Sequence, residues 1–151
     1  MVLLFVDFAT LLTASLLVGA MFGVWLIFNP VGLGANAYVA LQQQGIRTLN
    51  VAMPVLGAVA ALLTVASAAL GSENRTRFLL LLSAVICFVA AGLITRLLNQ
   101  PINAIVITWP VDAPPSNWTQ FRDAWWRWHL MRLVAGLSGL SLLIAGMLRR
   151  G

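Results

Sequence analysis

The sequence predicts an all-α integral membrane protein, a four-helix bundle with an interfacial segment rich in polar residues and tryptophan between the third and fourth helices. Of its 151 residues, 61% are hydrophobic and 9% are charged, and the mean hydropathy is +0.95. A water-soluble domain of this composition would have to expose much of its apolar surface to water. Four apolar runs are each long enough to cross a hydrocarbon core of ~30 Å as a helix.

The four runs are expected to form a single transmembrane domain over residues 1–151, with spans at about 8–28, 51–70, 78–95 and 129–148. Asp7 lies near the start of the first run, where the helix dipole favours an acidic side chain. Pro30 ends that run, because proline disfavours helix at the residue before it. Residues 31–49 are more polar, and should either lie in the interface or extend the second helix outward. Pro54 predicts a kink in the second span.

The third run leads into a polar stretch, where we expect Pro101 to break the helix and fold the 99–103 segment back over the bundle. The fourth helix should begin near Trp118, with Ser116 or Asn117 as its cap. Small residues recur every four positions in the first and fourth spans, which lets another helix approach closely. A homo-oligomer through these small faces is therefore an open alternative.

Four spans place both termini on one side of a membrane. With them lie Arg75, Arg77, Arg149 and Arg150, in a short turn and a tail, where the positive-inside rule is most informative. We therefore predict a multi-pass protein of the cell membrane with cytoplasmic termini. The arginine excess is explained by topology and headgroup anchoring, so the expected partners are the lipid bilayer and a small hydrophobic substrate, and not nucleic acid.

The start of the fourth helix carries the most informative pattern. Spacings of four, three, four and three place Trp118, Arg122, Trp125, His129 and Arg132 on one helix face. An aromatic belt with basic anchors would explain the tryptophans and arginines. It would not explain why His129 and Arg132 continue into the apolar run. We expect this face to point inward, because an arginine turned to lipid costs ~2.5–3.5 kcal/mol even on the lenient insertion scale.

Other side chains should lie at a similar depth in an antiparallel bundle. These side chains are Asn29, Arg47, Asn50, Arg96, Asn99 and Asn103, and all but Asn29 are candidate site residues. Trp109 is a further candidate for substrate binding. Ionisable residues within spans indicate a functional site by default. The alternative is a structural one, in which amides and guanidiniums bond to one another and to backbone that Pro54 and Pro101 release.

The available side chains limit the chemistry. One His, one Cys and four scattered acids cannot build a dinuclear carboxylate site or a closed zinc site, so we expect no metal. We also expect no cofactor, with haem on His129 as the remaining alternative. An imidazole with arginines and amides in an apolar pocket suits proton abstraction from an apolar carbonyl or phenolic compound. His129 would be the base, Arg96 and Arg132 would stabilise the oxyanion, and the other candidates would bind substrate.

The same residues carry a resemblance. The string Asn99-x-Pro101-x-Asn103, then Trp109, then Trp118-x3-Arg122-x2-Trp125-x3-His129-x2-Arg132 resembles the signature of the anthrone-oxygenase-like family of small four-helix membrane proteins. The Asn29-Pro30 end of the first span and the Arg47-x2-Asn50 pair also fit, so the resemblance covers nearly the whole chain. Bacterial members are mostly described as a domain of unknown function.

The characterised fungal members of that family are cofactor-free oxygenases that convert anthrones to anthraquinones. The resemblance therefore implies a membrane oxidoreductase that uses oxygen to oxidise an apolar polycyclic phenol. The alternative is non-enzymatic: a small membrane subunit or lipid-binding module, whose polar cluster is structural and whose tryptophans grip headgroups.

Overall fold

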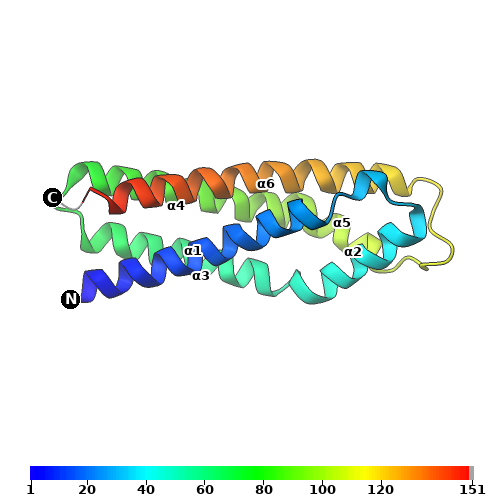
Figure 1. Cartoon of the computed structure of the whole chain (residues 1–151), viewed down its shortest axis with the longest axis horizontal. Helices are drawn as coiled ribbons and strands as arrows, with labels where there is room; N and C mark the ends of the chain where they lie inside the picture. Colours follow the sequence, from blue (N-terminus) through cyan, green and yellow to red (C-terminus); the bar gives the residue numbers. More distant parts are fainter. Residues whose placement is uncertain (150–151) are drawn as a thin grey trace.

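The computed structural model describes residues 1–149, which contain helices and loops and no strand (Figure 1). The elements in chain order are α1 (Val2–Ile27), η1 (Pro30–Gly32), α2 (Ala35–Leu49), α3 (Ala52–Leu70), α4 (Arg75–Ile94), η2 (Thr95–Asn99), α5 (Gln100–Val106) and α6 (Trp118–Met147). Within the described residues, four helical segments are long and apolar enough to cross a membrane: Val2–Gly32, Ala52–Leu70, Arg75–Val106 and Trp118–Met147. The predicted all-α, four-helix membrane fold is confirmed.

The third span does not break at Pro101, so the prediction that the 99–103 segment folds back is wrong. α4 passes through the π-helical turn η2 into α5, which carries the chain onward in the same direction (Figure 1). In a regular α-helix the ring of Pro101 would clash with the carbonyl of Leu97. The chain avoids this by widening the preceding turn, in which the Gln100 N–H donates to the carbonyl of Thr95, five residues back.

Helix length shows where the bundle leaves the hydrocarbon. Arg96 follows Arg75 by 21 residues on one helical segment, which is about 32 Å at the rise of an α-helix. That distance matches a hydrocarbon core of ~30 Å. We therefore expect the residues beyond Arg96 to lie at or outside the membrane boundary, together with α2 and the first turns of α6. Of the two alternatives for residues 31–49, α2 is an outward extension of α3 after a break at 50–51.

This outer part, which we name the cap, has its own small core. Tyr38, Val39 and Val106 are completely buried there, where α2 packs against α5. The Gln43 side-chain amide donates to the carbonyls of Val106 (3.0 Å) and Trp109 (2.8 Å). These bonds tie α2 to the end of α5 and to the loop that follows it.

The opposite half of the bundle is packed through small residues of α6. A Cβ on Gly139 would lie 2.9 Å from the ring of Phe88 on α4, and one on Gly146 would lie 3.2 Å from Leu81. The small face of α6 is therefore used inside the bundle. On α1, by contrast, Ser15 and Gly19 are exposed on the outer surface.

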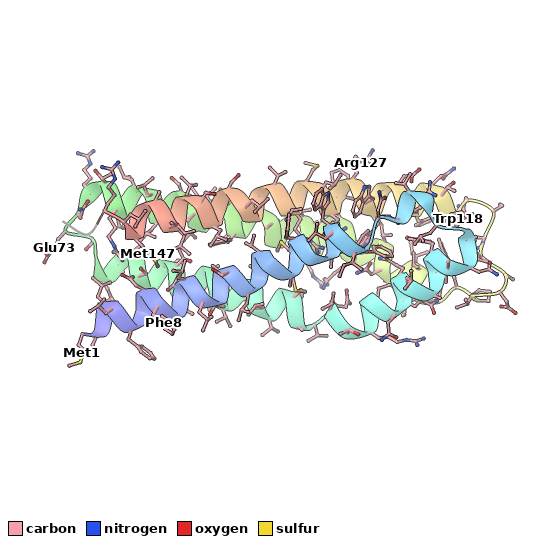
Figure 2. All side chains as sticks on the ribbon, in the orientation of Figure 1. Met1, Phe8, Glu73, Trp118, Arg127 and Met147 are labelled. Atoms are coloured by element: carbon pink, nitrogen blue, oxygen red, sulfur yellow. The ribbon has the colours of Figure 1, made fainter. Side chains whose placement is uncertain are left out.

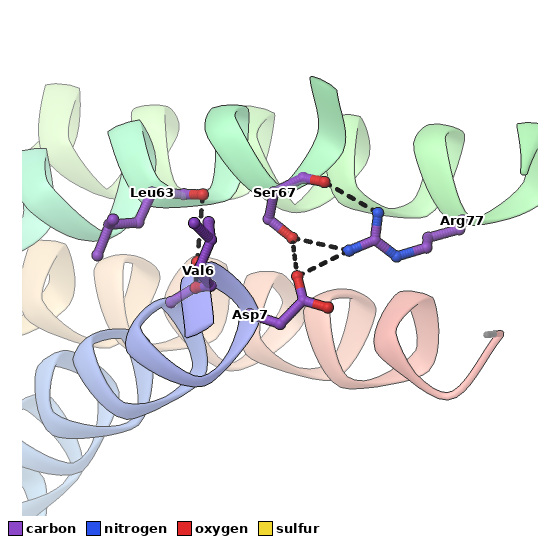
Figure 3. Close-up of polar contacts among 6 residues, drawn as sticks. Val6, Asp7, Leu63, Ser67 and Arg77 are labelled. Atoms are coloured by element: carbon purple, nitrogen blue, oxygen red, sulfur yellow. Dashed lines mark hydrogen bonds and ion pairs between the residues drawn. The ribbon is translucent and has the colours of Figure 1, made fainter. Parts of the chain in front are cut away.

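A buried ion pair joins α1, α3 and α4 near the terminal end (Figure 3). Arg77 donates to the carboxylate of Asp7 at 2.8 Å, to the Ser67 hydroxyl at 2.9 Å and to the Ser67 carbonyl at 2.9 Å, and the Ser67 hydroxyl also bonds to Asp7. Asp7 is 1% exposed and Arg77 is 3% exposed. The interpretations of Asp7 as a dipole charge and of Arg77 as a headgroup anchor are therefore wrong. Each charge is buried because the other compensates it.

Candidate functional site

The face of α6 that helical spacing predicts to point inward does point into the bundle. His129 is completely buried, and Trp125 and Arg132 are 7% and 9% exposed. Trp118 and Arg122, nearer the start of the helix, are half-buried. Arg127 lies on another face of α6, where it is exposed and points away from the bundle (Figure 2).

His129 and Arg132 form a buried pair. Nη2 of Arg132 lies 2.7 Å from Nδ1 of His129. A guanidinium can only donate, so Nδ1 accepts, and the neutral imidazole carries its proton on Nε2. The rings of Trp125 and Trp126 stack on the imidazole, with centroids 5.3 Å and 5.5 Å away. The orientation of the imidazole is therefore held by Arg132 and two indoles.

A first cavity of about 180 Å³ lies beside this pair, between α1, α2, the start of α3, η2, α5 and α6. We name it the amide cavity, because the amides of Gln42, Asn50 and Asn103 line it together with Arg132. Asn103 donates to Asn50 at 3.0 Å and accepts from Gln42 at 3.1 Å. The rest of its wall is mostly apolar. It is a concave, mainly apolar site with a few convergent polar groups, which is typical of small-molecule binding.

A second cavity of about 240 Å³ lies between α1, α3 and α4, and we name it the α3–α4 cavity. It shares with the amide cavity a boundary formed by Met21, Met53, Pro54, Thr95 and Arg132. Arg132 is held there by a long bond of 3.4 Å to the Thr95 hydroxyl. Arg96 and Gln100, joined by a bond of 2.9 Å, also line this cavity. Two arginines thus face the cavities, and no carboxylate is among the described residues that line them.

Several buried polar atoms around these cavities have no hydrogen-bond partner among the described residues. They include Nε of Arg132, Nε1 of Trp125 and Oδ1 of Asn99. Buried polar groups in folded proteins are normally bonded to protein or to water. Of these atoms, Nε of Arg132 and Nε1 of Trp125 belong to residues that line a cavity, where a bound polar molecule could pair with them.

The structure brings together only part of the predicted set. Asn50, Asn103, Trp125 and Arg132 line the amide cavity, and Arg96 lines the α3–α4 cavity. His129 lines neither cavity, because it lies behind Arg132 and Trp125. Asn99 is buried and donates to the Trp125 carbonyl at 3.1 Å, which ties η2 to α6.

The remaining candidates belong to the cap. Arg47 is exposed on α2. Trp109 packs edge-on against Phe121, and Trp118 lies against Tyr38. The guanidinium of Arg122 stacks on Trp118 and pairs with Asp123 at 2.8 Å. Trp109, Trp118 and Arg122 thus hold the cap together, and neither they nor Arg47 line a cavity.

Sequence reasoning did not identify Gln42 as a site residue. It lies in a run of three glutamines, of which Gln42 and Gln43 are buried and Gln44 is exposed. The signal that could have found it is the helical period of α2, since Gln42 falls between the buried Val39 and Ile46 at spacings of three and four.

The side chains of the site can be tested against what a metal ion or a haem needs as ligands. Among residues 1–149, no group of three or more His, Cys, Asp or Glu side chains could hold a metal ion. An axial haem ligand needs a histidine nitrogen that faces an open space. Nδ1 of His129 is bonded to Arg132, indoles stack on its ring, and neither cavity reaches it. The surroundings of His129 therefore do not fit a haem.

Comparison with known proteins identifies the family of the chain. The family model described as anthrone oxygenase matches residues 43–142, which is most of the chain and runs from α2 to the last turns of α6. No curated protein and no solved structure matches the chain. The matched region contains η2, α5 and both members of the buried His129–Arg132 pair. The chain therefore belongs to the anthrone oxygenase family, and this membership suggests an oxygenase-type function.

Proposed function

We propose that the protein is a cofactor-independent membrane oxygenase that oxidises an apolar aromatic ketone or phenol, of which an anthrone is the type that the family name indicates. The observation that supports this proposal is the position of Arg132. Its guanidinium is nine-tenths buried, borders two largely apolar cavities, and is bonded only to neutral groups in the described residues. A cation of this kind stabilises an oxyanion strongly, because little water screens it.

Arg132 would make the CH₂ group of the substrate more acidic. Loss of a proton from the CH₂ group of an anthrone-like ketone gives an enolate whose charge rests on the ketone oxygen. Placed against Arg132, that oxygen is stabilised as it becomes negative. The amides of Gln42, Asn50 and Asn103 would orient other oxygen atoms of the substrate, and Arg96 would contribute positive charge from the α3–α4 cavity.

His129 would receive the proton. In the free protein its Nδ1 accepts from Arg132. A substrate oxygen that takes over the Nη2 donor releases the lone pair of Nδ1, which can then bind the proton that leaves carbon. Trp125 would have to move slightly, because a general base must come within hydrogen-bond reach of the proton it takes. Asn99 would be a positioning residue, since it fixes η2 to α6.

The oxygen step then balances without a cofactor. The substrate carbanion gives one electron to O₂, and the resulting radicals combine to form a C–O bond. The imidazolium returns its proton to the peroxide, and the hydroperoxide loses water to leave a new ketone. One CH₂ group and one O₂ thus become one C=O group and one water. An apolar cavity suits this series of chemical steps, because excluding water protects the reactive intermediates.

Oxygen uptake and quinone absorbance, measured with an anthrone on protein in lipid nanodiscs, test the proposal. Arg132→Met should lower the rate by roughly 10²–10³-fold, as loss of an oxyanion donor does. His129→Gln should lower it by roughly 10²–10⁴-fold, since glutamine can still accept from Arg132 but cannot take the proton. Arg127→Met, on another face of α6, is the matched control and should keep the wild-type rate.

Full activity of Arg132→Met would exclude the proposed mechanism. A folded wild-type protein that consumes no oxygen with aromatic phenols would favour the non-enzymatic alternative, a small membrane subunit or lipid-binding module.

We also propose that the termini are cytoplasmic. The support is the pair of exposed arginines at that end, Arg75 at the start of α4 and Arg149 after the end of α6. Arg77 no longer contributes because it is buried, and Arg150 lies outside the described residues. A homo-oligomer, if formed through small residues, would use the exposed Ser15 and Gly19 face of α1.

A further inference from the structure

The α3–α4 cavity reaches the outer surface of the bundle. Its lining includes Ala58 on α3 and Val89 and Gly92 on α4, and all three are exposed. Gly92 follows Arg75 by 17 residues, which places it about 26 Å along the helical segment. This is still within a hydrocarbon core of ~30 Å. The cavity therefore opens toward lipid, near the boundary where the cap begins.

Small side chains create this opening. Gly57, Ala58 and Ala61 line it from α3, and Ala91 and Gly92 line it from α4. A Cβ on Gly92 would meet no heavy atom within 4 Å, and one on Gly57 would only touch a methyl group of Leu17 at 3.9 Å. Close packing of the helices therefore does not require these glycines.

The charges along the cavity favour a molecule with an acidic oxygen. Arg96 is exposed at its outer end, and it donates to the neutral amide of Gln100. Arg132 lies at its inner boundary, nine-tenths buried and with Nε unbonded among the described residues. Apolar walls between two such cations fit an aromatic body that carries a phenolic or enolic oxygen.

Each of the two cavities is small for a site that holds a whole aromatic ligand. At about 180 and 240 Å³, each is smaller than the ~300 Å³ at which small-molecule sites usually begin. A molecule that occupied both, past the shared boundary at Arg132, would have a volume within that range. A molecule that spans both would have its ionisable oxygen at the shared arginine.

We propose that the α3–α4 cavity is the entrance through which an aromatic phenol passes from the bilayer to Arg132, between α3 and α4. This inference rests on the proposed function and adds a route to it. Substrate would be taken from the hydrocarbon phase, where an apolar aromatic compound concentrates, and not from water through the cap.

Leucine at Gly92 tests the route, because its Cβ would meet no heavy atom within 4 Å and its larger side chain would occupy the opening. In nanodiscs that contain the substrate, Gly92→Leu should lower kcat/KM for anthrone oxidation by about tenfold or more, equivalent to about 1.4 kcal/mol. Ala58→Leu should act in the same direction from the facing helix. Gly19→Leu is the matched control, because Gly19 is exposed on α1, a Cβ there also meets nothing within 4 Å, and it lines neither cavity. Circular dichroism and thermal unfolding confirm that each variant folds.

A second measurement does not depend on turnover. An apolar phenol that carries a photoreactive diazirine should label the tryptic peptides 48–75 and 78–96, which contain α3 and most of α4. Gly92→Leu should reduce this labelling, and Gly19→Leu should not.

The outcomes separate the two proposals. An active Gly92→Leu protein with the wild-type kcat/KM, or labelling confined to the cap, would overturn the entrance and leave the oxygenase proposal intact. Labelling of both peptides in a protein that oxidises nothing would support the entrance and refute the oxygenase function.

Discussion

Replacing Asp7 by asparagine should strongly destabilise the terminal half of the bundle, because it leaves Arg77 as a buried cation without its carboxylate. Arg77 is 3% exposed, and it joins α4 to Asp7 on α1 and to Ser67 on α3. Removing one partner of a buried ion pair typically costs ~3–5 kcal/mol. Asparagine keeps an acceptor, and both bonds to Ser67 at 2.9 Å remain. We therefore expect the lower end, about 3 kcal/mol, or more than a hundredfold in the unfolding equilibrium.

Two further variants separate charge compensation from loss of hydrogen bonds. Asp7→Leu combined with Arg77→Met removes both charges, and the double variant should be within ~1 kcal/mol of wild type or more stable. Asp123→Asn is the matched control, because its ion pair with Arg122 is at the surface and Asp123 is 58% exposed. That change should cost less than ~1 kcal/mol.

Equilibrium unfolding in mixed micelles, with an increasing fraction of denaturing detergent and far-UV circular dichroism as the signal, measures these differences. The reasoning is refuted if Asp7→Asn is as stable as Asp123→Asn. The reasoning is also refuted if the double variant loses as much free energy of unfolding as Asp7→Leu and Arg77→Met lose together when each is made alone. In that case the two charges would not be compensating each other.

Three other predictions address packing, topology and cofactor content. Gly139→Ala places a Cβ 2.9 Å from the ring of Phe88, and should destabilise the same unfolding equilibrium by ~1–3 kcal/mol, whereas Gly19→Ala should change it by less than ~0.5 kcal/mol. In a cysteine-free background, an impermeant thiol reagent added to whole cells should label a cysteine at Ser116 and not one at Ser72; the reverse pattern would invert the proposed orientation. Purified protein should contain no stoichiometric transition metal or flavin by metal analysis and absorption spectroscopy, and a Soret band would contradict this.

Composition and periodicity were sufficient to predict four membrane-crossing helices. Lipid offers no polar partners, so a run of apolar residues of the right length has few alternatives to a helix. The same constraint predicted that His129 and Arg132 turn inward, because the alternative places a cation in hydrocarbon. Both conclusions depend on distances along one helix, which the spacing of residues contains.

Features that depend on how separate helices pack could not be predicted from composition and helical spacing. Helical spacing places His129 and Arg132 on one face, yet only the packed bundle shows that Arg132 borders the cavities and His129 lies behind it. Proline normally interrupts a helix, and a single widened turn allowed the chain to continue past Pro101. Asp7 and Arg77 are 70 residues apart, and each seemed to be a charge at the end of an apolar run. Their pairing was decided by tertiary structure. A buried charge is tolerated only where packing brings an opposite charge from another helix into contact with it.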